Sequence, residues 1–152
     1  MTEDEIDKAL DCSGFLTRIN AISNPNATPA NIDKALDDKL DIIRRIAASH
    51  QNASENNINK ALEDDVYDVR HDAIDNVNIT ASNINYALDS SDSYTRLTAI
   101  RNSKATEANI NKALDDTNID IKKAAIRHLN ATKANKEKAS NDPSLISYLL
   151  KK

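Results

Sequence analysis

The stretch "NPNATPANIDKALDD", residues 24–38, decides the fold because near copies of it recur along the chain. "HQNASENNINKALED" covers residues 50–64, "NVNITASNINYALDS" covers residues 76–90, and "NSKATEANINKALDD" covers residues 102–116. One isoleucine returns in each copy with a period of 26 residues, and the series reads Ile6, Ile32, Ile58, Ile84 and Ile110. A fixed period of this size is typical of a solenoid, in which each unit packs against the next.

Each unit reads as two short helices. Thr28 is a good N-cap and Pro29 suits the first helical position, so residues 28–53 begin with a helix. A second helix is expected over about residues 41–49, and it carries an alanine at the same position in every unit (Ala21, Ala47, Ala73, Ala99, Ala125). Helices this short are marginal in water by themselves. Neighbouring units must therefore supply the missing burial.

The sequence predicts an all-α fold: an α-solenoid of about five 26-residue two-helix repeats plus a C-terminal capping helix, in a single domain over residues 1–152. The repeats cover about residues 2–27, 28–53, 54–79, 80–105 and 106–131, with a degenerate half repeat and cap at 132–152. In that last segment Lys136 replaces the isoleucine. Asp142 and Pro143 open a final helix that ends in Lys151 and Lys152. Its leucines are expected to cover the apolar flank of the last repeat.

The amino-acid composition limits the fold class and the expected location. Aromatic residues make up 3%, there is no Trp, and the chain has one Gly and three Pro, which disfavours a β-sandwich or barrel. No apolar run is long enough to span a membrane. The acidic start "MTEDEIDKAL" lacks signal-peptide features, and a lone Cys12 fits a reducing compartment. A cytoplasmic location is expected.

The charge is uneven along the chain. Residues 1–76 carry 8 basic and 16 acidic side chains, a balance of −8. Residues 77–152 carry 12 basic and 8 acidic side chains, a balance of +4. Such asymmetry bears on partners and association rates rather than on the fold.

The repeat resembles HEAT-like helical repeats, and in particular the leucine-rich-variant type. The matching residues are Asn24, Pro25, Thr28, Pro29, Leu36, Asp37, Val69, Arg70 and Ala73. The resemblance covers residues 2–142 and implies an architecture rather than an activity. It also implies that the second helices line the concave side of the stack. An iron–sulfur segment can precede such repeats, but a single cysteine cannot hold a cluster.

A basic residue recurs at one position of the second helix (Arg18, Arg44, Arg70, Arg96, Lys122). Two interpretations are open: a phosphate-binding stripe, or a structural ladder in which each side chain pairs with a turn acid of its own or the next repeat. Those acids would be Asp11, Asp37, Glu63, Asp89 and Asp115. The ladder is favoured, since a position repeated in every unit is more simply explained by stacking than by a ligand.

Two further columns are polar. An asparagine recurs at the third position of the first helix (Asn31, Asn57, Asn83, Asn109, Asn135), where its amide is expected to bond backbone in an adjacent turn or repeat. The second helices are expected to end at His50, Asn76, Asn102 and His128. Asparagine at such a position suits a left-handed cap.

The binding surface is expected at positions whose residue changes from one repeat to the next. One strip of the second helices changes from apolar to acidic to basic along the chain, and it supplies the predicted partner-binding residues. These are Ile42, Arg45, Asp68, His71, Asp72, Tyr94, Leu97, Arg101, Lys123 and Arg127. The competing interpretation is that its apolar members are core.

The sequence does not indicate a catalytic or metal-binding site. Asp68, His71, Asp72 and Asp75 share a helix face at a spacing that can hold a divalent metal, but a solvated acidic face is the better reading because no ligand from another element is identifiable. No Ser/His/Asp or Cys/His set, phosphate loop or zinc motif is present. No catalytic residue, metal or cofactor is therefore predicted.

The sequence thus favours a non-enzymatic protein-binding scaffold that uses the variable surface of the second helices. The alternative is a nucleic-acid-binding repeat protein that uses the basic C-terminal half, against which stand a pI of about 5.3 and few aromatic residues. The expected partner is a protein, with the chain either monomeric or weakly self-associating through its C-terminal helix. The compact, Asn-rich array also looks similar to small repeat proteins of phages and bacteria, some of which bind host factors.

Overall fold

The computed structural model describes residues 1–150, so Lys151 and Lys152 lie outside the described residues. Those 150 residues contain helices and no strand, which confirms the all-α prediction. The contacts divide the chain into two compact units, Met1–Ile79 and a second that begins at Thr80. The division falls between two predicted repeats.

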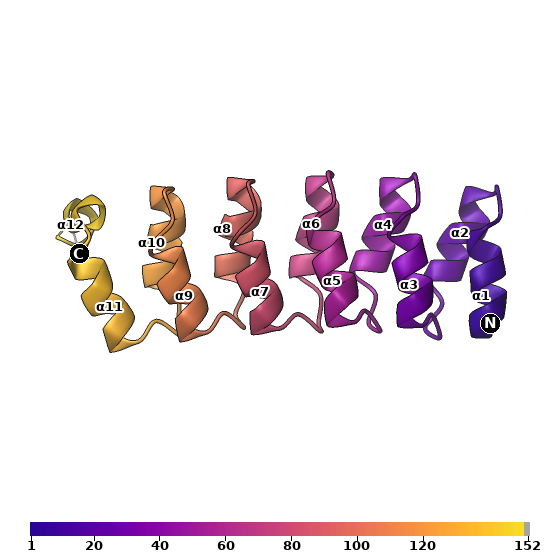
Figure 1. The fold of residues 1–152 in the computed structure, drawn as a ribbon, viewed down its shortest axis with the longest axis horizontal. Helices are drawn as coiled ribbons and strands as arrows, with labels where there is room; N and C mark the ends of the chain where they lie inside the picture. Colours follow the sequence, from indigo (N-terminus) through magenta and orange to yellow (C-terminus); the bar gives the residue numbers. More distant parts are fainter. Residues whose placement is uncertain (151–152) are drawn as a thin grey trace. The chain divides into compact units, whose positions relative to one another are not determined.

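Each unit is a stack of helical pairs in chain order, as in a solenoid (Figure 1). The first unit contains α1 (Glu3–Leu10), α2 (Phe15–Ile22), α3 (Pro29–Ala35), α4 (Asp41–Ala48), α5 (Glu55–Leu62) and α6 (Tyr67–Ile74). The second unit contains α7 (Ala81–Ala87), α8 (Ser93–Arg101), α9 (Glu107–Ala113), α10 (Ile119–Arg127), α11 (Lys133–Ser140) and α12 (Pro143–Leu149). None of them is long and apolar enough to cross a membrane, as far as the described residues go.

Both units have the same two-layer arrangement. In the first unit α1, α3 and α5 contact one another in succession, and so do α2, α4 and α6. In the second unit α7, α9 and α11 form one layer while α8, α10 and α12 form the other. The second helix of each described pair is an α-helix. The layer of second helices is the one that carries the predicted variable strip.

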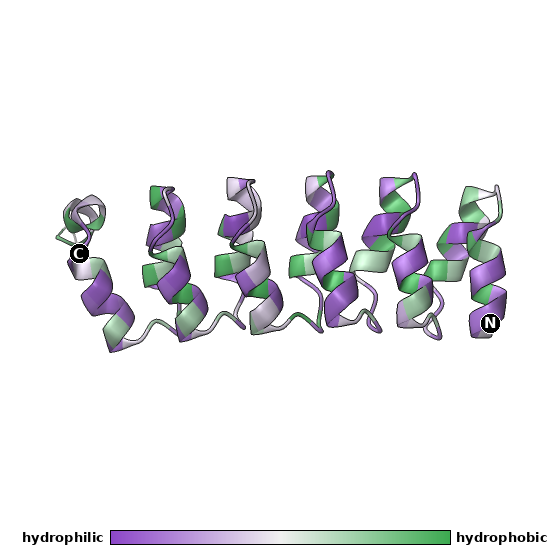
Figure 2. Cartoon of the chain, viewed as in Figure 1, coloured by the Kyte–Doolittle hydropathy of each residue, from purple (hydrophilic) through white to green (hydrophobic). Residues whose placement is uncertain are grey.

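The core is built from the repeated apolar columns. Ile6, Ile32 and Ile58 in the first unit and Ile84 and Ile110 in the second have no exposed surface. The alanine column of the second helices is equally buried. Figure 2 shows green apolar bands beside purple polar ones on the same helices. The narrow apolar stripes explain why no helix could be stable alone.

All six first helices begin after a threonine or serine N-cap that recurs every 26 residues, and each makes a capping box (Thr2, Thr28, Ser54, Thr80, Thr106, Thr132). The side chain of Thr28, for example, accepts from the Asn31 backbone N–H while Asn31 Oδ1 accepts from the Thr28 backbone N–H. The amide of Asn31 also donates to the carbonyl oxygen of Glu3, in the preceding repeat, at 3.4 Å. The asparagine column therefore closes the helix start and ties it to the neighbouring repeat, as expected.

The ends of the second helices differ from the prediction. None of the described non-glycine residues has a positive φ, so the expectation of a left-handed asparagine cap is wrong. Asn76 instead donates to the carbonyl oxygens of Ala48 and His50 in the preceding repeat, at 2.7 and 3.1 Å, and accepts from the Asn78 backbone N–H. The side-chain amide of Asn76 therefore connects two repeats, and the backbone of this residue does not form a left-handed cap.

The C-terminal helix α12 takes the place of a second helix in the last pair. It contacts α10 and α11, and Leu145 on it is fully buried. Asp142 caps its first turn by accepting from the Ser144 backbone N–H. Leu150, by contrast, is 82% exposed. The helix thus covers the last repeat with Leu145, while Leu150 at its C-cap lies in solvent.

Candidate binding groove

The basic column of the second helices forms a structural ladder. Arg44 Nε lies 2.6 Å from Asp64, and its Nη1 donates to the carbonyl oxygen of Asp38 in its own turn. Arg18, Arg44 and Arg96 each join their own turn to the turn of the next repeat. Arg70 donates to the carbonyl oxygens of Asp64 and Asp65 in its own turn, and Ser90 stands where the next turn would supply an acid. Four ion pairs connect one repeat to the next: Arg18–Asp38, Arg44–Asp64, Arg96–Asp116 and Lys122–Asp142. These four cations are already paired, which disfavours the phosphate-stripe interpretation.

The identity of the acids corrects the prediction. The partner of Arg18 is Asp38 and not Asp37 or Asp11, because the side chain reaches the second acid of the next turn. That carboxylate also accepts from the Leu40 backbone N–H, which holds it in place. In the second unit, burial raises the pKa of the Asp116 carboxyl, but hydrogen bonds from Arg96 and the Asn118 backbone N–H outweigh it. The net pKa lies below its ordinary value.

The acids that were expected to pair with arginine bind lysines instead. Lys34 lies 2.9 Å from Asp11, Lys60 lies 2.9 Å from Asp37, and Lys138 lies 2.7 Å from Asp115. Sequence reasoning missed this second ladder. Its signal was available as a 26-residue column that reads Lys8, Lys34, Lys60, Tyr86, Lys112 and Lys138. The carboxylates here are largely exposed, so each pair contributes little to stability.

In the first unit, most of the predicted partner-binding residues bind one another. Arg45 lies 2.7 Å from Asp72 and 3.7 Å from Asp68, which joins α4 to α6. His71 lies 3.4 Å from Asp75. Ile42 is 44% exposed. The described residues contain no group of three or more His, Cys, Asp or Glu placed to hold a metal ion.

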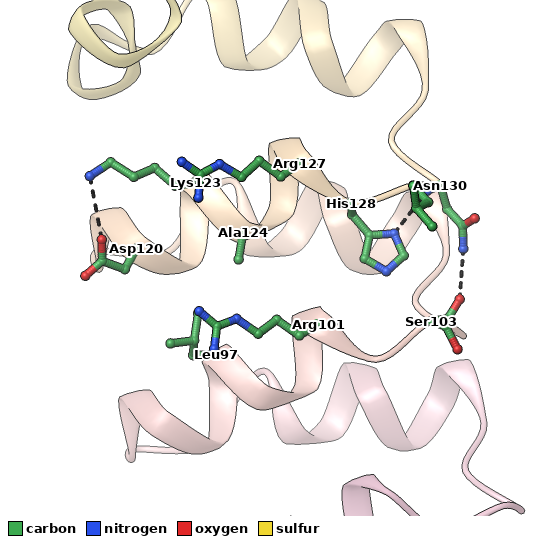
Figure 3. A pocket seen from close by; sticks show the side chains of 10 residues that line it. Leu97, Arg101, Ser103, Asp120, Lys123, Ala124, Arg127, His128 and Asn130 are labelled. Carbon is green, nitrogen blue, oxygen red and sulfur yellow. Dashed lines mark hydrogen bonds and ion pairs between the residues drawn. The ribbon is translucent and has the colours of Figure 1, made fainter.

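In the second unit, four predicted residues border one groove. The groove lies between α8 and α10 and has a volume of about 660 Å³. Leu97 and Arg101 come from α8, and Lys123 and Arg127 from α10 (Figure 3). The fifth predicted residue, Tyr94, is 69% exposed and does not line the groove.

The loops complete the groove with residues that sequence reasoning did not select. Ser103, His128, Leu129 and Asn130 contribute from the segments that follow α8 and α10. Asn130 donates to the carbonyl oxygen of Ser103 at 3.1 Å, which fixes one loop against the other. Leu129 is 98% exposed. Its column varies (Pro25, Gln51, Val77, Ser103, Leu129), and that variation was the available signal.

Tyr148 of α12 lies beside the same two basic residues of α10. The guanidinium of Arg127 is 4.8 Å from the ring centroid, and the ammonium of Lys123 is 5.8 Å from it. Arg127 also donates a hydrogen bond to the Tyr148 hydroxyl. These cation–π contacts restrain both side chains at the edge of the groove.

Comparison with known proteins assigns the chain to no family. No protein-family model matches the chain, and no curated protein matches it. The groove is therefore interpreted from its own residues. The groove is lined by the cationic side chains of Arg101, Lys123 and Arg127 and by one carboxylate, that of Asp120, which lies 3.6 Å from Lys123. The arrangement suits an anionic group next to an apolar one.

Proposed function

We propose that the chain is a non-enzymatic, protein-binding scaffold whose docking site is the groove between α8 and α10. We also propose that its repeats are HEAT-like and of the leucine-rich-variant type, as the residue pattern of Asn24, Pro25, Thr28 and Pro29 suggests. Repeat stacks of this kind present an extended surface on which some columns maintain the fold and others are free to vary. The single exposed Cys12 supports a reducing, cytoplasmic setting.

The proposed function is supported mainly by the residues that line the groove. The columns that hold the stack together repeat from unit to unit and are satisfied by ion pairs and backbone hydrogen bonds. The groove-lining columns vary: the one that contains Arg101 and Arg127 has Ser23, Ser49 and Asp75 in the other repeats. A concave site that combines apolar side chains with a few convergent polar groups is the ordinary form of a binding site.

Peptide selection tests this function. A random peptide library displayed on phage is selected against the immobilised full-length protein, and the enriched peptides are measured against two double variants. Arg101→Gln/Arg127→Gln removes two positive charges from the groove. Lys133→Gln/Lys136→Gln removes two positive charges from α11, outside the groove, and is the matched control.

The expected result is a set of peptides that bind the wild type and the α11 variant but not the groove variant. Circular dichroism and thermal melting verify that both variants stay folded. A selection whose peptides bind the groove variant as well as the wild type would overturn the docking site.

Nucleic-acid binding is a second candidate, favoured by the cluster of Arg101, Lys123 and Arg127 beside one groove. Phosphate contacts add up over a basic surface and are steeply salt-dependent. Binding through this cluster would fall more in Arg101→Gln/Arg127→Gln than in the α11 variant, whereas general attraction to a basic surface would fall equally in both. Anisotropy with labelled single- and double-stranded oligonucleotides at physiological salt separates the candidates. We expect weak binding with no difference between the two variants.

A further inference from the structure

The two arginines of the groove differ from the other arginines for which the structure gives an ion pair. Arg18, Arg44, Arg45 and Arg96 each have Nε within 2.7 Å of a carboxylate. Among residues 1–150, the side chain of Arg101 forms no hydrogen bond or ion pair. Arg127 contacts Tyr148 and no carboxylate in the same part of the chain. Two guanidinium groups beside one groove are thus without an acidic partner.

The position of the two arginines in their helices explains in part why neither has a carboxylate partner. Arg101 and Arg127 are the last residues of α8 and α10, where a positive charge interacts favourably with the helix dipole. That interaction needs no carboxylate. It does not account for both forks bordering the same groove together with Lys123, nor for the aromatic ring that restrains Arg127.

A guanidinium fork is suited to a carboxylate, because two parallel N–H groups meet its two oxygens. Arg101 and Arg127 occupy equivalent positions in consecutive repeats, on helices that contact each other. They can therefore receive two carboxylates of one chain. Because Tyr148 already restrains Arg127 and Lys123, binding loses less side-chain entropy than it would with free side chains.

The groove also has an apolar part. Leu97 of α8 and Ala124 of α10 are half-buried in its wall, and Leu129 at its rim is 98% exposed. An apolar side chain of a partner would remove this surface from water. A ligand that matches the whole groove therefore carries acidic and apolar groups together.

We infer that the groove binds an acidic segment of a partner protein, with carboxylates on Arg101 and Arg127 and an apolar side chain against Leu97 and Leu129. This inference rests on the proposed function and specifies the chemistry of the partner. A protein segment fits better than a nucleic acid because the carboxylate of Asp120 lies in the groove wall. A nucleic acid carries a negative charge at every nucleotide, whereas a peptide can alternate acidic and neutral residues. A peptide can place an apolar or amide group there.

The test uses a fluorescein-labelled synthetic peptide in which glutamates alternate with leucines and serines, measured by anisotropy with the full-length protein at physiological salt. Two matched peptides replace every glutamate by glutamine or every leucine by serine. The protein variants are Arg101→Gln/Arg127→Gln and its control Lys133→Gln/Lys136→Gln. A second pair is Leu129→Ser and its control Leu150→Ser, which changes a leucine that is 82% exposed at the C-cap of α12.

The acidic, leucine-containing peptide is expected to bind, and its affinity should fall about tenfold or more in the groove double variant and with the glutamine peptide. The Leu129→Ser variant and the serine peptide should each bind more weakly, whereas the two control variants should match the wild type. An equal loss in both charge variants, or tighter binding of an oligonucleotide than of the acidic peptide, would overturn the inference.

The phage selection distinguishes this failure from that of the proposed function. Groove-dependent peptides without acidic residues would leave a protein-binding groove in place and refute its acidic specificity. Enriched peptides that are acidic, contain an apolar residue and require Arg101 and Arg127 would support both.

Discussion

Arg44 Nε lies 2.6 Å from the carboxylate of Asp64 in the next repeat, and both side chains are largely buried. The same arginine donates to the carbonyl oxygen of Asp38 in its own turn. One guanidinium therefore joins two successive turns. Its hydrogen bonds with Asp64 raise the pKa of Arg44 further, so the pair stays ionised. Such pairs set the register of one repeat on the next.

Replacing this arginine should weaken the stack. Arg44→Ala leaves the Asp64 carboxylate buried without its main partner, which should lower the free energy of unfolding by about 1–3 kcal/mol. Arg45→Ala on the same helix is the control, because its ion pair with Asp72 is more exposed and should contribute less. Urea denaturation of both variants measures the difference. Equal midpoints for Arg44→Ala and the wild type would remove the structural role of the ladder.

His50 should be replaceable by asparagine but not by alanine. Its Nδ1 accepts from the Asn52 backbone N–H, and its Nε2 donates to the carbonyl oxygen of Asn24. At the equivalent position, Asn76 makes the same two kinds of bond: its Oδ1 accepts from the Asn78 backbone N–H, and its Nδ2 donates to the carbonyl oxygen of His50. His50→Ala should cost about 1–3 kcal/mol because buried backbone groups lose their partners. His50→Asn should restore most of that loss in thermal melting, and a variant as unstable as His50→Ala would contradict the equivalence.

The stability of the C-terminal pair should depend on acid pH. Hydrogen bonds from the side chain of Lys122, and from the side chain and backbone of Ser144, lower the pKa of Asp142 from 3.8 to about 2. A lowered pKa stabilises the folded chain fully above pH 3.8, and the contribution is lost as the pH falls through about 2. Asp142→Asn keeps an N-cap but removes the charge.

The difference in unfolding free energy between wild type and Asp142→Asn should accordingly be constant at neutral pH and shrink in acid. Urea titrations over a pH series measure it, with Lys122 unchanged in both proteins. A difference that stays the same down to the acid limit would show that the charge of Asp142 contributes nothing to the fold.

The capping helix should depend on one leucine and tolerate the loss of another. Leu145→Ala removes a fully buried side chain and should cost about 2–5 kcal/mol. Leu150→Ala changes a side chain that is 82% exposed, and its effect should stay within about 0.5 kcal/mol. Amide hydrogen exchange in α12 and urea denaturation measure both. Sedimentation of the Leu150 variant also tests self-association, which should weaken if this helix joins two copies.

The sequence by itself determined the local structure of this protein. The isoleucine period, the caps at Thr28 and its equivalents, and the alanine column predicted the helical pairs, because capping and apolar periodicity act within a few residues. The variable columns also indicated Leu97, Arg101, Lys123 and Arg127, which the tertiary structure places around one groove.

Only the tertiary structure decided which side chains meet. Two adjacent acids, Asp37 and Asp38, follow each other in one turn, yet the first binds Lys60 and the second binds Arg18. Neighbouring residues in a turn point in different directions, and the stacking of repeats decides which partner each direction meets. For the same reason the sequence could not show that Arg45 is paired while Arg101 is unpaired among the described residues. A charge column reveals periodicity, but a binding site depends on which charges the fold leaves unsatisfied.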